Sequence, residues 1–112
     1  GAEVLFDAFS SLPGLSSAVL VAALAGDSAA KATLVERIYR PLQAHSSDLV
    51  TTLWSYLDNG RSLEATAREL FVHPNTVRYR LRRIQDVTGY NPADAREAYV
   101  LRMAITLGRL QD

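Results

Sequence analysis

Hydrophobic residues recur every three to four positions along most of the 112-residue chain, and no segment alternates strictly between apolar and polar residues. The first pattern is typical of amphipathic helices, whereas the second would indicate strands. Prolines and glycines separate the periodic segments. The sequence therefore predicts an all-α fold, a compact helical bundle of about six helices.

The first 45 residues are expected to contain three helices. We expect a short helix at 3–9, followed by a helix of small apolar residues at 16–25 that stops at Gly26. A third helix is expected at 28–40. It should end at Pro41, because proline lacks the N–H group that the helix interior requires.

The middle of the chain predicts a longer helix, a sharp stop and a short helix. Ser47 is a suitable N-cap for a helix that carries an apolar stripe and buries Trp54. The stop is at 58–60, where Asn and Gly accept a left-handed C-cap conformation. Ser62 should cap the short helix, which is expected to direct four apolar residues inward: Leu63, Ala67, Leu70 and Phe71.

The connection at 72–74 joins two helices over only about three residues. It therefore predicts a sharp crossing and a helix-turn-helix, with a second helix at 74–88 that ends at Gly89. A final helix should start with Asn91 as N-cap and run to about residue 110. Because it is apolar on more than one face, we expect it either in the core or partly at a subunit interface.

The helix at 74–88 has two chemically different faces. Val77, Leu81 and Ile84 lie on the edge that should pack inward, and the opposite edge carries polar side chains. Arginine can bind guanine bidentately and asparagine can do the same with adenine, so that edge is a candidate DNA-reading surface. We expect base contacts from Asn75, Thr76, Arg78, Tyr79 and Arg82. We expect phosphate contacts from Arg61, Ser62, His73, Arg80 and Arg83.

Charge is unevenly distributed. The whole chain is neutral, with 12 basic and 12 acidic residues, but 61–83 contains six arginines and only two glutamates. Such a local excess favours docking on phosphates, although a run of charges can also be a solvated helix face. Arg80 leans toward the core, and pairing with Glu64 or Glu69 is the alternative to a phosphate contact. For His73, a structural role in the turn is the alternative to a phosphate contact.

The residues offer no support for an enzyme, a metal site or a bound cofactor. The chain has no cysteine, and its two histidines, His45 and His73, lie far apart in the sequence. No nucleophile motif, glycine-rich loop or paired-carboxylate motif is present. The longest apolar run, at 18–25, is far shorter than the roughly 20 residues of a membrane span. We therefore expect no membrane partner.

The run from Ala67 to Ile84, with its His73-x-Asn75-Thr76-x-x-Tyr79-Arg80-Leu81 core, resembles the C-terminal helix-turn-helix domain of PucR/CdaR-type bacterial transcriptional regulators. The similarity extends over about 37–110 and includes the segments at 56–60 and 88–89. It implies a cytoplasmic regulator that binds double-stranded promoter DNA and senses a small-molecule effector through an upstream domain. That domain lies outside this sequence, so we expect a piece of a longer protein.

The resemblance also shapes the expected organisation. Residues 1–33 should form helices that lead from the upstream domain, and 34–112 should form the DNA-binding domain, the two parts making one compact unit. A single such domain has a small footprint, so the full-length protein is expected to be a homo-oligomer, such as a dimer on paired half-sites.

Two other functions fit the same helices. One is a protein-interaction or dimerisation module whose arginines bind an acidic partner. The other is a sigma-factor-like promoter-contact domain, which would also bind RNA polymerase. The salt dependence of binding to duplex DNA separates the interaction module from the two DNA-binding functions.

Overall fold

The computed structural model describes residues 17–112, and these residues form helices without any strand. The helix expected at 3–9 lies outside the described residues. The elements are α2 (Ser17–Leu24), α3 (Ser28–Leu34), η1 (Val35–Tyr39), α4 (Arg40–His45), α5 (Ser47–Asp58), α6 (Leu63–Leu70), α7 (Pro74–Thr88) and α8 (Ala95–Gln111). The π-helical turn η1 joins α3 and α4 into one continuous rod, so the described residues form six helical rods. The prediction of an all-α bundle is confirmed.

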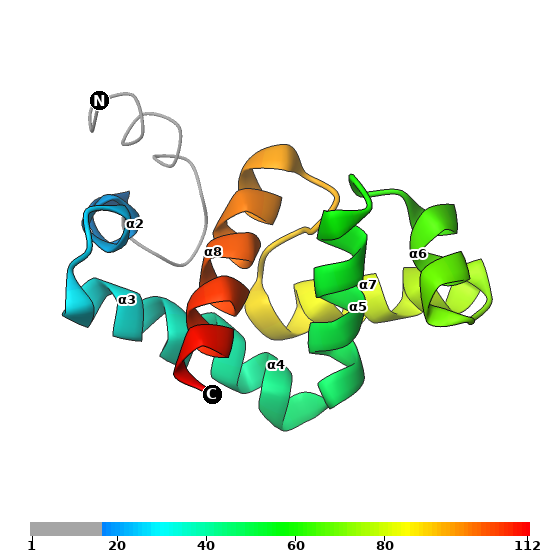
Figure 1. The fold of residues 1–112 in the computed structure, drawn as a ribbon, viewed down its shortest axis with the longest axis horizontal. Coiled ribbons are helices and arrows are strands. Elements are labelled where there is room, and N and C mark those ends of the chain that lie inside the picture. The colour runs from blue at the N-terminus through cyan, green and yellow to red at the C-terminus, as the bar shows by residue number, and fades with distance from the viewer. Residues whose placement is uncertain (1–16) are drawn as a thin grey trace.

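The bundle is elongated, measuring 40 × 27 × 21 Å along its principal axes. Figure 1 shows α2 at one end, α6 and the start of α7 at the other end, and α8 between them. The helix-turn-helix segment is therefore remote from the first described helix.

Pro41 does not end a helix, contrary to the sequence prediction. The N–H of Arg40 donates to the carbonyl of Val35, five residues back, so the chain passes through a π turn before α4 begins. In a regular α-helix, the ring of Pro41 would collide with the carbonyl four residues before it. The wider π turn displaces that carbonyl, so the chain accommodates the proline. Pro41 then lies in the first turn of α4, where a missing N–H costs little.

Two predicted N-caps are one to three residues out of place. Ser46, rather than Ser47, caps α5 by accepting a hydrogen bond from the N–H of Asp48. Asp94, rather than Asn91, caps α8 by accepting from the N–H groups of residues 96 and 97. Asn91 instead organises the preceding turn, where its side chain accepts from the N–H of Ala93. A capping side chain must stand in extended backbone directly before the helix, and several oxygen-bearing side chains compete for that place in each loop.

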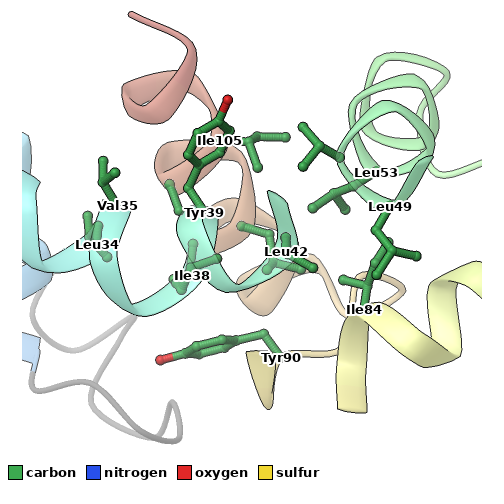
Figure 2. Packing of buried hydrophobic residues seen from close by; sticks show 14 of the residues in the cluster. Leu34, Val35, Ile38, Tyr39, Leu42, Leu49, Leu53, Ile84, Tyr90 and Ile105 are labelled. Atoms are coloured by element: carbon green, nitrogen blue, oxygen red, sulfur yellow. The ribbon is translucent and has the colours of Figure 1, made fainter. Parts of the chain in front are cut away.

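The hydrophobic core forms around the α3–η1–α4 rod. In Figure 2, side chains of this rod point toward residues of α5, α7 and α8, and Tyr90 closes the cluster from below. Trp54, expected in the core, is half-buried and packs against the edge of the cluster. The guanidinium of Arg109 lies 4.4 Å from the centre of its ring. The fully buried members with the largest side chains are Leu34, Ile38, Leu42, Leu53, Ile84, Leu101 and Ile105.

The end of α8 is fastened to η1 by a close approach and a hydrogen-bonded carboxylate. A Cβ atom built on Gly108 would lie 2.2 Å from Cγ of Tyr39, so glycine permits this contact. The Tyr39 hydroxyl donates to Asp112 at 2.6 Å, and Arg40 and Gln43 also donate to this carboxylate. The hydrogen bond from Tyr39 and the Arg40 guanidinium lower the pKa of Asp112. The same hydrogen bond, with burial, raises the pKa of the Tyr39 phenol.

Phe71 is the clearest error among the predicted inward-facing residues. The other three apolar residues of its set are buried or half-buried, but 95% of the Phe71 surface is exposed. Phe71 is the first residue after α6 and has left-handed backbone, with φ of 56°. That conformation breaks the helical periodicity, so the side chain leaves the inward face.

Candidate nucleic-acid interface

The turn between α6 and α7 is held by backbone hydrogen bonds that end one helix and allow the next to begin at once. The N–H of Val72 donates to the carbonyl of Ala67, and the N–H of Phe71 donates to that of Arg68. This pair is a Schellman motif, which requires left-handed backbone at Phe71. Ala67 of α6 and Val77 of α7 are both buried, as the helical periodicity predicted.

Both helices of this unit start with a side-chain cap. The Ser62 hydroxyl accepts from the N–H of Ala65 at 3.2 Å, which confirms Ser62 as the cap of α6. His73 caps α7, because its Nδ1 accepts from the N–H of Asn75 at 3.0 Å. A neutral imidazole that accepts at Nδ1 carries its proton on Nε2, so His73 also presents an N–H donor beside the N-terminus of α7.

The outer face of α7 is open to solvent. Asn75, Arg78, Tyr79, Arg82 and Asp86 are all exposed, as the helical periodicity predicted. Tyr79 exposes 62% of its surface. Within residues 17–112, the side chains of Tyr79 and Arg82 make no hydrogen bond, ion pair or ring contact. Thr76 is half-buried at the side of this face.

Asn75 and Arg78 are joined on this face. Nη1 of Arg78 donates to the Asn75 side-chain oxygen at 2.8 Å. The two side chains lie one helical turn apart and orient each other, while the Asn75 amide and the remaining guanidinium N–H groups stay available as donors.

Arg80 and Arg83 flank the outer face and contact the helices behind it. Arg80 donates to the Thr52 hydroxyl at 3.2 Å and lies 3.7 Å from the Asp48 carboxylate, so it ties α7 to α5. Arg83 lies 3.5 Å from Asp86 and 3.1 Å from Nε2 of His45.

The proposed pairing of Arg80 with Glu64 or Glu69 is wrong. Glu69 instead accepts hydrogen bonds from Ser55 of α5 and from Asn59, the residue directly after α5. The acidic partner of Arg80 comes from the first turn of α5, an element that periodicity alone does not place beside α7.

Arg61 lies outside α7, in the connection between α5 and α6. It has left-handed backbone, with φ of 64°, and its Nη1 donates to the Ala93 carbonyl at 2.7 Å. Its guanidinium therefore links this connection to the loop before α8. The remaining N–H groups of that guanidinium have no partner among the described residues.

Two exposed residues near the turn were missed as candidates. Arg68 lies in the last turn of α6, and no residue between 17 and 112 bonds to its side chain. Its position opposite the buried face of α6 could have been found from the helical periodicity. Phe71 could not, because its exposure depends on the left-handed backbone that ends α6.

Other kinds of site have little in their favour in the described part of the chain. Between residues 17 and 112, no three His, Asp or Glu side chains gather as a metal ion would need. None of the helices there combines the length and apolar character that crossing a membrane requires. A shallow groove of about 280 Å³ lies between α2 and α8, and no residue of α6 or α7 lines it.

Known proteins with similar sequences are longer than this chain. Residues 49–107 match the family of PucR C-terminal helix-turn-helix domains. An uncharacterised protein of Mycobacterium tuberculosis is 54% identical over 88 residues, which are 79% of this chain and 21% of the relative. The purine catabolism regulatory protein of Bacillus subtilis is 35% identical over 68 residues, which are 61% of this chain and 13% of that protein.

A solved structure has the same fold. The crystal structure of a regulator of polyketide synthase expression from Bifidobacterium adolescentis superposes with a TM-score of 0.82 and 38% sequence identity. The match covers 99% of this chain and 48% of the other.

Proposed function

The chain belongs to the family of PucR C-terminal helix-turn-helix domains, and from this premise we propose that it binds promoter DNA sequence-specifically, with α7 in the major groove. Asn75, Thr76, Arg78, Tyr79 and Arg82 contact the bases. The observation that carries the proposal is the open outer face of α7, which begins directly after a tight turn and holds Arg82, a side chain without a partner among residues 17–112.

The chemistry of this face suits base edges. The Arg82 guanidinium can donate two parallel hydrogen bonds to guanine O6 and N7, and an asparagine amide can pair with adenine N6 and N7. The bond between Asn75 and Arg78 orients both side chains before binding, which reduces the entropy lost when they contact DNA.

Phosphate contacts hold α7 in register. His73 donates from Nε2 beside the N-terminus of α7, where the helix dipole also favours an anion. We assign further phosphate contacts to Arg61, Ser62, Arg80 and Arg83. Each of these side chains already has a partner within the domain, so it would bind DNA from a restrained position.

The longer protein is proposed to act in the cytoplasm as a homo-oligomer on paired half-sites. A small-molecule effector would act through an upstream domain of the longer protein. Half-sites on one face of the duplex would be spaced by one helical turn, about 34–36 Å, or a multiple of it.

The test combines selection from a random duplex pool with titration of variants on the selected duplex. Arg82→Ala should relax base choice at one position, worth about 1–3 kcal/mol of discrimination. Arg83→Ala should weaken all sequences alike and make the salt slope shallower by about 0.9. Arg109→Ala is the matched control, since Arg109 is exposed on α8 and packs over Trp54.

The salt dependence of duplex binding distinguishes the proposed function from that of a protein-interaction module. The three arginines assigned to phosphates, Arg61, Arg80 and Arg83, should give a log–log slope of roughly −3, because counterion release follows the charged side chains. No measurable duplex binding, or a flat response to salt, would overturn the proposal in favour of a protein-interaction module. Stable binding to RNA polymerase would instead favour the sigma-factor-like domain.

A further inference from the structure

The side chain of Phe71 contributes almost nothing to the stability of the fold. Its backbone is left-handed, a conformation that glycine adopts freely and that strains an L residue. With 95% of its surface exposed, the ring buries almost no area against the domain. The Schellman motif at the end of α6 uses only backbone groups at this residue, and glycine would serve it better.

Arg61 also has left-handed backbone, but a hydrogen bond from its side chain compensates for the strain. It is the other non-glycine residue with positive φ between residues 17 and 112. Its side chain donates to the Ala93 carbonyl at 2.7 Å and so joins two connections of the fold. The Phe71 side chain has no such contact in the described part of the chain, and a strained, exposed aromatic residue indicates a partner outside the domain.

The surroundings of Phe71 favour nucleic acid over protein. Its exposed neighbours in sequence are polar: Arg68, Glu69, His73 and Asn75. A protein partner would need a contiguous apolar patch, whereas three of the other exposed apolar residues, Leu24, Tyr99 and Leu110, lie on α2 and α8. The segment 61–83 carries six arginines and two glutamates, which suits a polyanion.

We propose that the Phe71 ring packs against a deoxyribose of the DNA backbone and positions the N-terminal end of α7 at the edge of the major groove. The inference rests on the proposed function. A phosphate at the N-terminus of α7 is contacted by the Nε2–H of His73, two residues after Phe71. The sugar joined to that phosphate offers the apolar surface that the ring covers. The contact is uncharged and independent of base identity.

The experiment measures affinity by fluorescence anisotropy on the selected duplex and on a random duplex, across a salt series. Phe71→Ala should weaken binding to both duplexes roughly tenfold, without changing base preference. Its salt slope should equal that of the wild type, because no phosphate contact is lost. Phe71→Tyr keeps the ring and should bind like the wild type.

Phe71→Gly separates the ring from the backbone. This variant should be at least as stable as the wild type in thermal unfolding, because glycine accepts the left-handed conformation, yet it should bind as weakly as Phe71→Ala. If it binds as tightly as the wild type, the inference is overturned.

The outcomes also distinguish this inference from the proposed function. Wild-type affinity in Phe71→Ala together with reduced affinity in Arg82→Ala would overturn the sugar contact and leave the function standing. Altered base preference in Phe71→Ala would overturn the backbone assignment. Failure of the wild type to bind any duplex would remove the proposed function and the inference with it.

Discussion

The two ends of the molecule are stabilised in different ways. Where η1 and α8 meet, large apolar side chains such as Leu101 and Ile105 are fully buried, and Gly108 lets a tyrosine ring pack on the helix backbone. At the other end, the buried residues of α6 and the first half of α7 are small, namely Thr66, Ala67 and Val77. Side-chain caps and polar bonds to α5 complete that end.

This difference separates the source of stability from the proposed site of DNA contact. Apolar burial at the η1–α8 end supplies most of the hydrophobic stabilisation, so changes there should alter unfolding and leave the outer face of α7 intact. Changes at the α6–α7 end should instead alter local order and binding. The three predictions below test this separation, from the largest expected effect to the smallest.

Gly108→Ala should give the largest loss of stability. The new methyl group would overlap the buried Tyr39 ring, so the free energy of unfolding should fall by about 1–3 kcal/mol in urea titration. Duplex affinity at a temperature where the variant is folded should match that of the wild type.

The control places the same substitution in a Tyr39→Ala background, where the overlapping ring atoms are absent. There Gly108→Ala should cost nothing or should stabilise, because alanine is the better helix former by about 1 kcal/mol. An equal cost in both backgrounds would show that the close approach is not the cause.

His73→Ala should have a smaller and local effect. Losing the cap costs about 1 kcal/mol and should speed amide hydrogen exchange in the first turn of α7, while the core around Leu101 stays protected. His73→Asn keeps an acceptor and should restore protection. Faster exchange throughout the domain would contradict the separation of the two ends.

Asp112→Asn should have the smallest effect, seen in the pH dependence of stability. The folded state lowers the pKa of Asp112 from its ordinary 3.8, so the carboxylate stabilises the fold above that pH. This contribution should be lost as the pH falls through the lower folded value. The wild type and the variant should therefore differ at neutral pH and converge in acid, as followed by thermal unfolding. A difference that persists below the folded pKa would exclude the ionised carboxylate as its source.

Periodicity was sufficient to predict the regular helices and the exposed edge of α7. Val77 and Ile84 are buried while Asn75 and Arg82 are exposed, because a straight helix of fifteen residues keeps its faces in phase. Gly89 also ended α7 where expected, since its left-handed backbone favours glycine.

The errors arose where contacts between distant segments decide the outcome. Asp48 precedes Arg80 by 32 residues, so no helical spacing connects the two. Tyr39 and Gly108 likewise meet through tertiary packing, although a glycine inside a helix is itself a sign of close approach. Phe71 continues the apolar periodicity of α6 in the sequence, but the helix ends one residue earlier, at Leu70.

The π-helical turn at Val35–Tyr39 has a consequence for how relatives of this domain should be aligned. A π turn holds one residue more than an α-helical turn, so a homologue that lost a residue here could return to a regular helix with the flanking faces unchanged. Pro41 would then meet the carbonyl of the preceding turn. A homologue with a one-residue gap inside this rod should therefore also have another residue in place of Pro41. An alignment that moves the gap into a neighbouring loop would misplace α3 by one residue.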